Sequence, residues 1–182
     1  MHQKNLVRKK YFLVRKKKYY EINKDFFIPC VDLMKSKLKK NFKLALYYPS
    51  SFEINVLKLL EISYVSKQKL LLPKIEGSNK MNFFPWKKNE VLKINKYGML
   101  EPIKTTKSIP NIILVPLLAF DDNKHRLGYG KGFYDRYLNK YLKKYKNILT
   151  IGVAFSFQKY HKLPISIMDV KLNYILTEKG IY

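Results

Sequence analysis

The sequence is short of cysteine, of acidic residues and of long hydrophobic runs. A single cysteine, Cys30, excludes a disulfide within the chain and fits a reducing compartment. No apolar run approaches the ~18 residues that a membrane-spanning helix needs. The basic N-terminal segment, residues 4–20, lacks the apolar core and small-residue cleavage site of a signal peptide. We therefore expect a cytoplasmic protein with no membrane partner.

Acidic residues are few: 13 Asp and Glu face 37 Lys and Arg, which gives a formal net charge of +24. Such a charge attracts nucleic acids, acidic membranes and phosphorylated metabolites. The cations are mostly lysines scattered along the whole chain, so a solvated surface accounts for most of them. An alternative function is nucleic-acid binding, in which the positive charge contacts phosphates and some of the fifteen tyrosines stack on bases.

Hydrophobic residues, in contrast, are plentiful, at 47% of the 182 residues, with 15% aromatic. A chain of this length and composition can bury a core of its own. No repeat, low-complexity linker or composition shift divides it. We expect one domain, residues 1–182, that is monomeric.

Short apolar runs alternate with segments of helical spacing along most of the chain. The runs are typical of buried parallel strands; they span residues 44–48, 69–75, 111–115, 148–155 and 174–177. Helical spacing marks residues 52–62, where Ser50 or Ser51 can cap the helix, and residues 131–145. Residues 4–20 favour an amphipathic first helix. The alternation predicts an α/β fold, with a mostly parallel central sheet flanked by helices in a Rossmann-like arrangement.

Residues 76–110 interrupt this alternation with two glycines and three prolines. We expect them to form an inserted, loop-rich wall. In open α/β sheets, ligands bind beyond the carboxyl ends of the strands. The insertion is therefore predicted to face the loop described next.

The segment Arg126-Leu-Gly-Tyr-Gly-Lys-Gly-Phe-Tyr-Asp135 places three of the seven glycines within five residues. Glycines let the backbone N–H groups converge on phosphate oxygens, Arg126 and Lys131 supply countercharge, and the predicted helix adds its dipole. Neither a Walker A loop nor a dinucleotide fingerprint fits, because Lys131 is followed by Gly132 and the sixth position of the Gly-x-Gly pattern is Phe133. A tight turn without a ligand is the alternative for the glycines alone.

With its upstream run Asn-Ile-Ile-Leu-Val-Pro-Leu-Leu-Ala-Phe-Asp121, this segment resembles the signature of the 5-formyltetrahydrofolate cyclo-ligase family, also called methenyltetrahydrofolate synthetases. Further motifs follow the family's order over nearly the whole chain. They are Lys4-Asn-Leu-Val-Arg8, Tyr48-Pro-Ser-Ser-Phe-Glu53, Leu72-Pro73, Met81-Asn-Phe83, Glu101-Pro102, Phe157-Gln158, Leu163-Pro164, Asp169 and Thr177.

The resemblance implies an enzyme with the cyclo-ligase fold, similar to the NagB, RpiA and CoA-transferase-like group. It implies ATP- and Mg²⁺-dependent conversion of 5-formyltetrahydrofolate, with or without a polyglutamate tail, to 5,10-methenyltetrahydrofolate, ADP and phosphate. The γ-phosphoryl group would activate the formyl oxygen before N10 attacks. Such a transfer depends mainly on placement and charge neutralisation.

The resemblance also implies roles for individual residues. ATP would be bound by Lys4, Arg8, Arg126, Leu127, Gly128, Tyr129, Gly130, Lys131, Gly132, Phe133 and Tyr134. Among these, Arg126, Lys131 and Tyr134 would act in catalysis. The metal would be held by Asp135 and Asp169, since two carboxylates with waters and phosphate oxygens suit Mg²⁺. The folate would contact Tyr48, Glu53 and Tyr129, and pack beside Met81, Phe83 and Trp86.

Several of these residues have a purely structural alternative. Glu53 and Asp135 can be first-turn acids of their helices. Lys4 and Arg8 can belong to a solvated helix face, and aromatic and methionine side chains such as Trp86 are more often core than ligand wall. The three histidines have no metal-ligand spacing.

The chain also departs from the family at two positions. Phe133 stands where the family often has Tyr, and Met168 stands where His is expected. A diverged ATP binder without folate activity is therefore a further alternative.

Overall fold

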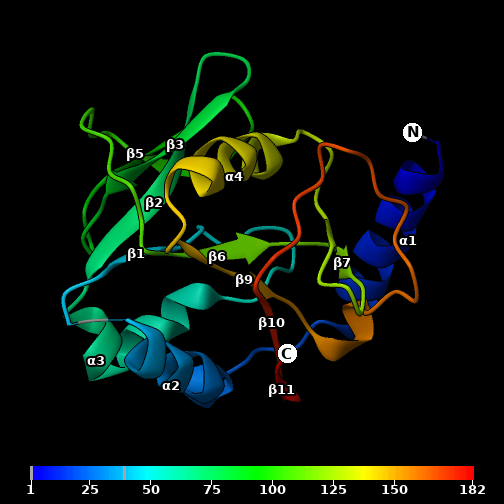
Figure 1. Cartoon of the computed structure of the whole chain (residues 1–182), viewed down its shortest axis with the longest axis horizontal. Helices are drawn as coiled ribbons and strands as arrows, with labels where there is room; N and C mark the ends of the chain where they lie inside the picture. Colours follow the sequence, from blue (N-terminus) through cyan, green and yellow to red (C-terminus); the bar gives the residue numbers. More distant parts are fainter. Residues whose placement is uncertain (1, 39) are drawn as a thin grey trace.

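The computed structural model describes residues 2–38 and 40–182 and is built on a seven-stranded sheet (Figure 1). The strand order is β11-β10-β9-β6-β1-β2-β3, in which β2, β1, β6, β9 and β10 are mutually parallel. The two edge strands, β3 and β11, are antiparallel to their neighbours. The bounds are β1 Lys43–Ala45, β2 Lys69–Glu76, β3 Lys80–Pro85, β6 Ile112–Pro116, β9 Leu149–Val153, β10 Tyr174–Thr177 and β11 Gly180–Ile181. The predicted mostly parallel α/β sheet is confirmed.

Strand direction along the sheet explains where a ligand crevice forms. The chain proceeds from β1 to β2 on one side, whereas β6 pairs with β1 on the other side. The connections that leave β1 and β6 therefore diverge at the carboxyl ends of these strands. In open α/β sheets this is the place where ligands bind.

Alternate residues of each central strand pack into two separate cores. Leu44, Leu70 and Ile112 point to the face covered by α2 (Ile28–Lys37), η2 (Val56–Glu61) and α3 (Ser63–Ser66). Ala45 and Ile113 point to the opposite face, which α4 (Phe133–Lys144) covers. Figure 1 shows α4 on one side of the sheet and α2 and α3 on the other. The period-two alternation of buried strands produces this layering.

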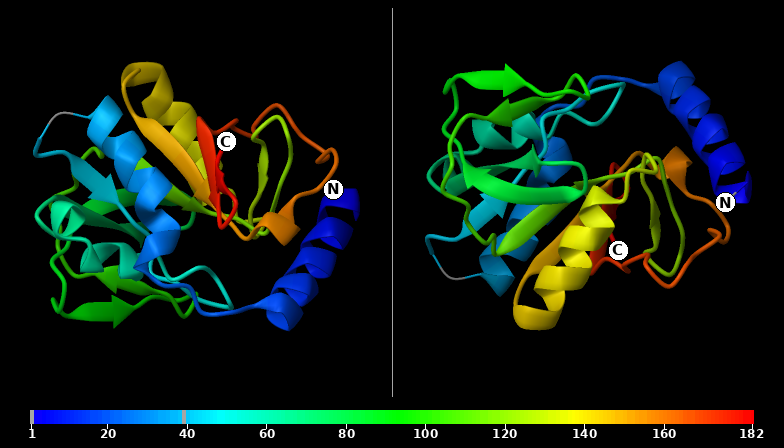
Figure 2. Two further views of the ribbon diagram at one scale, coloured as in Figure 1. Left: turned by 90° about the horizontal axis from the view of Figure 1, so that it is seen from below. Right: turned by 90° about the horizontal axis from the view of Figure 1, so that it is seen from above.

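The N-terminal helix α1 (His2–Lys18) stands at one end of the molecule, and an extended segment leads from it to η1 (Lys24–Phe27) and α2 (Figure 2). Val7 and Tyr11 of this helix pack against Leu127 in a third, smaller core. That core includes residues of the short ribbon β7 (Ala119–Phe120) and β8 (Arg126–Leu127). No helix within the described ranges is both long and apolar enough to span a bilayer.

The helix predicted for residues 52–62 was wrong in extent and cap. Ser51 and Phe52 have positive φ angles of 49° and 66°, which stop a helix from including them. Helical structure begins only at η2, where the Asn55 side chain accepts a hydrogen bond from the Leu57 amide at 3.1 Å. Residues 50–53 form a turn instead, closed by the Glu53 amide donating to the Ser50 carbonyl at 2.9 Å.

The predicted loop-rich wall contains more regular structure than expected. β3 pairs along six residues of β2, and β4 (Leu92–Ile94) pairs with β5 (Leu100–Pro102) as a hairpin. Gly77 and Gly98 lie in the turns of these two ribbons, at φ angles of 66° and 75°. These glycines therefore mark tight turns between paired strands, where a loop was predicted.

Candidate active site

Two adjoining cavities lie at the glycine loop. The larger has a volume of about 360 Å³ and the smaller about 240 Å³. Arg126, Gly132 and Asp135 line both of them. The loop is therefore a shared wall between the two spaces.

The glycine loop joins β8 to α4 in strand–loop–helix order, as predicted. Gly130 and Gly132 have φ angles of 95° and 67°, and Gly132 is the N-cap of α4. The positive φ favours glycine at position 132, and a Cβ atom there would lie 2.6 Å from Nη1 of Arg136, so the arginine side chain would have to shift. Because the first amides of a helix lack intrahelical partners, this end of α4 offers N–H groups and a positive dipole to an anion.

Basic side chains from three elements surround the smaller cavity. Lys4 and Arg8 come from α1, and Arg126 and Arg136 come from β8 and α4. The Arg8 guanidinium donates to the Gly128 carbonyl at 2.9 Å, which fixes α1 against the loop. Four cations against two carboxylates leave this cavity with a surplus of positive charge suited to phosphate.

The two carboxylates of the smaller cavity are Asp135 and Asp169. Asp135 accepts from Arg126 at 2.9 Å, and Asp169 accepts from Lys4 and from the Ser166 amide. Burial opposes ionisation of Asp169, but the hydrogen bonds from Lys4 and Ser166 outweigh it and lower the pKa of Asp169. Asp169 is therefore available as an anionic oxygen ligand.

Across the described part of the chain, no three His, Cys, Asp or Glu side chains gather as a metal cluster. A divalent cation in the smaller cavity would thus have two carboxylates and would need oxygens from water and phosphate. Mg²⁺ commonly binds in this way, so Asp135 and Asp169 fit it.

The larger cavity is mostly apolar and lies at the crevice predicted by the sheet topology. Its walls come from the segment after β1, the end of β6, the β2–β3 ribbon, the β4–β5 hairpin and the glycine loop. They include Tyr47, Tyr48, Ser50, Ser51, Glu53, Pro73, Ile75, Met81, Asn95, Tyr97, Met99, Leu100, Pro116, Tyr129, Lys131, Phe133 and Tyr134. An apolar cleft with a few placed polar groups is typical of a small-molecule site.

Glu53 is the acid of the larger cavity besides Asp135, and it is 8% exposed. Its Oε1 accepts from the Tyr129 hydroxyl at 2.7 Å, and its Oε2 accepts from the Ser50 amide at 2.9 Å. Burial raises the pKa of Glu53, although Tyr129, Ser50 and Arg15 act in the opposite direction. Since η2 begins only at Val56, the alternative of a first-turn helix acid does not hold for Glu53.

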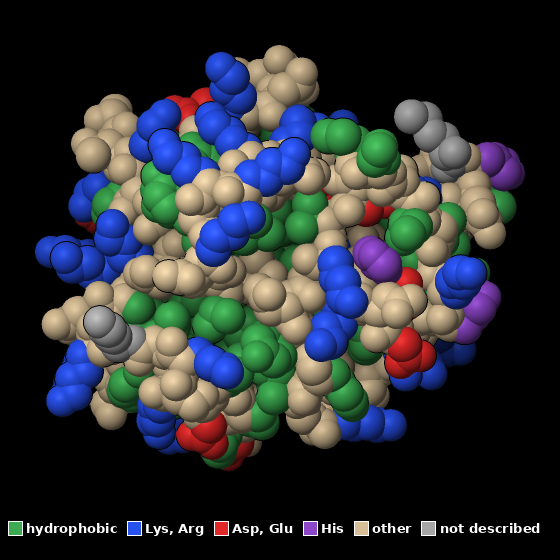
Figure 3. All heavy atoms as spheres, in the orientation of Figure 1, with side chains coloured by type: hydrophobic (Ala, Val, Ile, Leu, Met, Phe, Trp, Pro, Cys, Tyr) green, Lys and Arg blue, Asp and Glu red, His purple; other side chains and the backbone are tan. Residues whose placement is uncertain are grey.

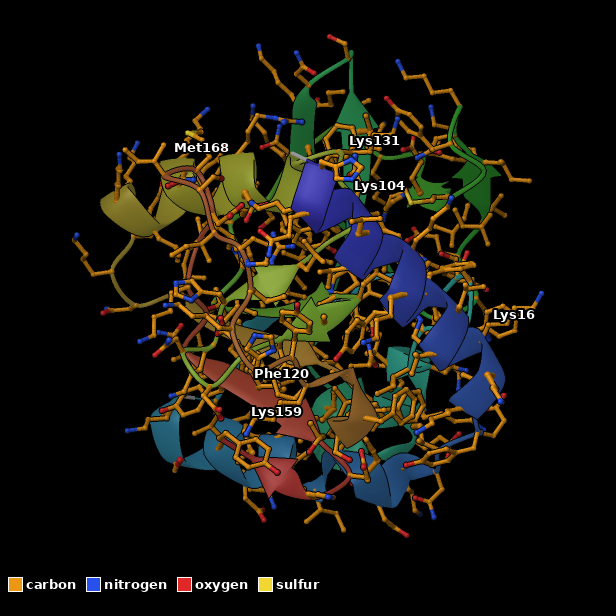
Figure 4. The ribbon with its side chains drawn as sticks, turned by 90° about the vertical axis from the view of Figure 1, so that its right-hand side faces the viewer. Lys16, Lys104, Phe120, Lys131, Lys159 and Met168 are labelled. Carbon is orange, nitrogen blue, oxygen red and sulfur yellow. The ribbon has the colours of Figure 1, made fainter. Side chains whose placement is uncertain are left out.

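Two further side chains of the loop face the larger cavity. The Tyr134 hydroxyl is buried and has no hydrogen-bond partner among the described residues. The Lys131 ammonium lies 5.6 Å from the centre of the Tyr97 ring, and Lys131 lines the larger cavity. Figure 4 shows Lys131 near the N-terminal end of α1.

Comparison with known proteins agrees with this architecture. The model of the 5-formyltetrahydrofolate cyclo-ligase family matches residues 30–178. The chain belongs to this family.

Cyclo-ligases similar to this chain include a probable 5-formyltetrahydrofolate cyclo-ligase of Schizosaccharomyces pombe, 31% identical over 83% of this chain and 81% of the relative. The 5-formyltetrahydrofolate cyclo-ligase of Mycoplasma genitalium is 34% identical over 73% of this chain and 70% of its own. Among solved structures, the 5,10-methenyltetrahydrofolate synthetase of Aquifex aeolicus is similar with a TM-score of 0.76 and 31% identity, covering 98% of this chain and 91% of the other.

Within this cyclo-ligase fold, two predicted substrate residues lie away from the larger cavity. Phe83 is fully buried in the core and packs edge to face on Tyr137, with ring centres 4.9 Å apart. Trp86 lines a separate hollow at the amino ends of β1 and β2, together with Lys43 and Lys69. The expectation that they pack beside the folate is corrected, because only Met81 lines the larger cavity. Phe83 lies on the same face of β3 as Met81 but packs against Tyr134 and Tyr137, whereas Trp86 belongs to the core on the opposite face.

The cyclo-ligase site also contains residues that the sequence did not single out. Arg136 lines the smaller cavity and donates to the Lys131 carbonyl at 2.8 Å. The sequence indicated this residue only through its position in the predicted helix, four residues after Gly132. Arg15 of α1 reaches Tyr129 from behind the larger cavity.

Proposed function

We propose that this protein is an ATP- and Mg²⁺-dependent 5-formyltetrahydrofolate cyclo-ligase that forms 5,10-methenyltetrahydrofolate, ADP and phosphate. Family membership supports the reaction class. The observation that carries the proposal is that two cavities of different chemistry meet at Arg126, Gly132 and Asp135. A reaction that transfers a phosphoryl group between two bound molecules requires such a meeting point.

The chemistry assigns one substrate to each cavity. The smaller, basic cavity would bind the ATP phosphates, and the larger, apolar cavity would bind the folate rings. The formyl oxygen attacks the γ-phosphorus, and the bond to ADP breaks. N10 then attacks the activated formyl carbon, the C–O bond breaks and inorganic phosphate leaves with the oxygen. Loss of the N10 proton leaves the five-membered ring of the methenyl product.

On the nucleotide side, Lys4, Arg8 and Arg126 would neutralise phosphate charge, and the backbone of Gly128, Gly130 and Gly132 would approach the phosphate oxygens. Mg²⁺ held by Asp135 and Asp169 would supply further neutralisation of the phosphates. Leu127, 3% exposed on β8, contributes a wall of this cavity and packing beneath it.

At the shared wall, Arg126, Lys131 and Tyr134 would act on the transferred group. Lys131 lies on the folate side, where its ammonium can approach the formyl oxygen and the γ-phosphoryl group together. The partnerless hydroxyl of Tyr134 can donate to an oxygen that becomes negatively charged during transfer. Phe133 lines the same cavity without a hydroxyl.

On the folate side, the Glu53 carboxylate would accept hydrogen bonds from the amine and ring N–H groups of the pterin. Tyr48, Met81 and Tyr129 would form the apolar and polar walls around it. The substrate can carry a polyglutamate tail. We further propose that the whole chain forms one domain and acts as a cytoplasmic monomer.

The alternative of a nucleic-acid binder is not favoured. Figure 3 shows Lys and Arg side chains dispersed over one face of the molecule, among hydrophobic and other side chains, and not gathered into a stripe. A surface of this kind has a general positive potential but no continuous basic groove along which a nucleic-acid backbone could bind.

The proposal is tested by following the near-ultraviolet absorbance of the methenyl product with 5-formyltetrahydrofolate, ATP and Mg²⁺. Growth of the band only when ATP is present is expected. Lys131→Ala and Asp135→Asn should each lower turnover strongly in protein that remains folded. Wild-type turnover in both variants would contradict the residue assignment, and absence of product from folded wild type would contradict the activity.

A further inference from the structure

Arg15 is a buried cation that the proposed reaction does not yet use. It projects from α1 and is 1% exposed. Its guanidinium donates to the Leu117 carbonyl at 3.1 Å, to the Ser51 carbonyl at 2.8 Å and to the Tyr129 hydroxyl. Three segments that are distant in sequence, those after β1, after β6 and in the glycine loop, are therefore joined at this one side chain.

The contact with Tyr129 continues to the substrate-binding acid. The same hydroxyl that accepts from Arg15 donates to Glu53 at 2.7 Å. An arginine has donors only, so its bond to the tyrosine oxygen directs the single phenolic proton toward Glu53. The guanidinium carbon also lies 5.5 Å from the centre of the Tyr129 ring, which holds the ring in place.

The need of buried Arg15 for a nearby negative charge also supports a connection between Arg15 and Glu53. No ion pair of the described chain includes Arg15, although a fully buried cation without a counter-charge is costly. The Glu53 carboxylate is reached through one hydroxyl, and Arg15 acts to lower the pKa of Glu53 against the effect of burial. The other groups that face this carboxylate are Ser50, which donates to it, and the neutral phenols of Tyr47 and Tyr134.

We propose that Arg15 is a positioning residue that acts through Tyr129 to hold the Glu53 carboxylate ionised and oriented for the N–H donors of a reduced pterin. This inference rests on the proposed function and extends it, since it makes the N-terminal helix part of folate recognition as well as of phosphate binding. Arg15 touches no substrate itself. Its loss therefore weakens folate binding more than ATP binding.

The test compares Arg15→Met, Arg15→Lys, Tyr129→Phe and the double variant Arg15→Met/Tyr129→Phe. Tyr11→Phe is the matched control, because the Tyr11 hydroxyl anchors the same helix by donating to the Lys159 carbonyl at 2.8 Å, far from Glu53. Equilibrium binding of 5-formyltetrahydrofolate without ATP is measured beside the KM for each substrate and the thermal midpoint.

Arg15→Met should raise the Kd for 5-formyltetrahydrofolate by about tenfold or more, as expected for a lost charge-assisted hydrogen bond. The KM for ATP should stay within about twofold of the wild-type value. The Kd of Arg15→Lys for 5-formyltetrahydrofolate should lie between the values of wild type and Arg15→Met, since one donor and the charge remain. Adding Tyr129→Phe to Arg15→Met should raise the Kd for 5-formyltetrahydrofolate only slightly further, because both changes break the same hydrogen-bonded connection to Glu53. Tyr11→Phe should lower the thermal midpoint without altering folate affinity.

Folate affinity within about twofold of wild type in Arg15→Met, or fully additive losses in the double variant, would overturn the inference. If Arg15→Met does not fold, the test uses Arg15→Lys and Tyr129→Phe instead. Unchanged folate affinity in both of these variants would also overturn the inference. Wild-type protein that neither binds nor converts 5-formyltetrahydrofolate would instead contradict the proposed function, and the inference would fall with it.

Discussion

Arg126 and Asp135 form an ion pair, with 2.9 Å between Nη2 and Oδ1, in the wall that the two cavities share. The Arg126 side chain is 3% exposed and the Asp135 side chain 21%. Each member has a second proposed partner: phosphate for the arginine and Mg²⁺ for the aspartate. Binding of the nucleotide with its cation would therefore replace this internal pair with two external ones.

Asp135→Asn tests that exchange. We expect the variant to lose about 2 kcal/mol of unfolding free energy, since a mostly buried arginine keeps a hydrogen-bond acceptor but loses its counter-charge. We also expect the stabilisation by ATP to become insensitive to Mg²⁺. Thermal denaturation with ATP, with and without Mg²⁺, measures both effects. Asp122→Asn is the control, because Asp122 is 70% exposed and pairs only with Lys159. An undiminished Mg²⁺ effect in Asp135→Asn would remove Asp135 from the metal site.

The hydroxyls of Tyr134 and Tyr137 offer a matched pair on one helix. Both are buried without a hydrogen-bond partner among the described residues, but only Tyr134 lines the larger cavity. Replacing either by Phe should leave the thermal midpoint unchanged or raise it, because an unsatisfied buried hydroxyl contributes no stability. Tyr134→Phe should nevertheless lower kcat/KM by about tenfold, and Tyr137→Phe should not. Equal kinetic effects of the two changes would show that the Tyr134 hydroxyl has no role in the reaction.

Gly132 is predicted to tolerate no side chain. Gly132→Ala introduces a Cβ at a φ of 67° and 2.6 Å from the Arg136 guanidinium. Gly77→Ala is the control, since Gly77 has nearly the same φ, 66°, and no atom within 4 Å of its Cβ position. Both should lose about 1–2 kcal/mol of unfolding free energy from the left-handed backbone. Only Gly132→Ala should also weaken ATP binding, which a fluorescent ATP analogue can report. Equal ATP affinity in the two variants would argue against phosphate binding at the loop.

Glu53 should make stability depend on pH. Burial raises its folded-state pKa above the ordinary value of 4.5, so the folded protein binds this proton more tightly than the unfolded chain does. The stability that Glu53 contributes is therefore fully present below that ordinary value and is lost as the pH rises through the folded-state pKa. Glu53→Gln does not titrate at this position. The unfolding free energy of wild type minus that of Glu53→Gln should fall as the pH rises, by no more than about 1.4 kcal/mol per unit. A difference independent of pH would contradict a raised pKa.

The sheet and α4 were predictable because each depends on local pattern. Residues 112–115 and 174–176 are short runs without a charged residue, and the structure has β6 and β10 there. The glycine loop could be located for the same reason, since three glycines within five residues indicate a tight turn. The carboxyl ends of parallel strands then bring Glu53 and the loop together without any further information.

Burial of individual basic and aromatic side chains was only partly predictable from pattern. Arg15 lies four residues after Tyr11 and eight after Val7, so helical spacing puts it on the buried face of α1. As a cation followed by three lysines it was nevertheless not singled out, whereas Figure 4 shows Lys16 pointing away from the molecule. The family resemblance predicts Trp86 beside the folate with Met81, yet the antiparallel return of β3 carries it to the amino ends of β1 and β2. Both outcomes depend on tertiary contacts made by distant segments.

The contact between Lys4 and Asp169 joins residues 165 positions apart, across almost the full length of the chain. During synthesis, α1 leaves the ribosome before β1, β2, β3, β6 and β9, and all five of these strands are made before Asp169 is. A chain that stops short of Asp169 has Arg8 and the glycine loop but not the far wall of the smaller cavity. Translation products that end before Asp169 would therefore lack one of the two proposed Mg²⁺ ligands and the partner of Lys4.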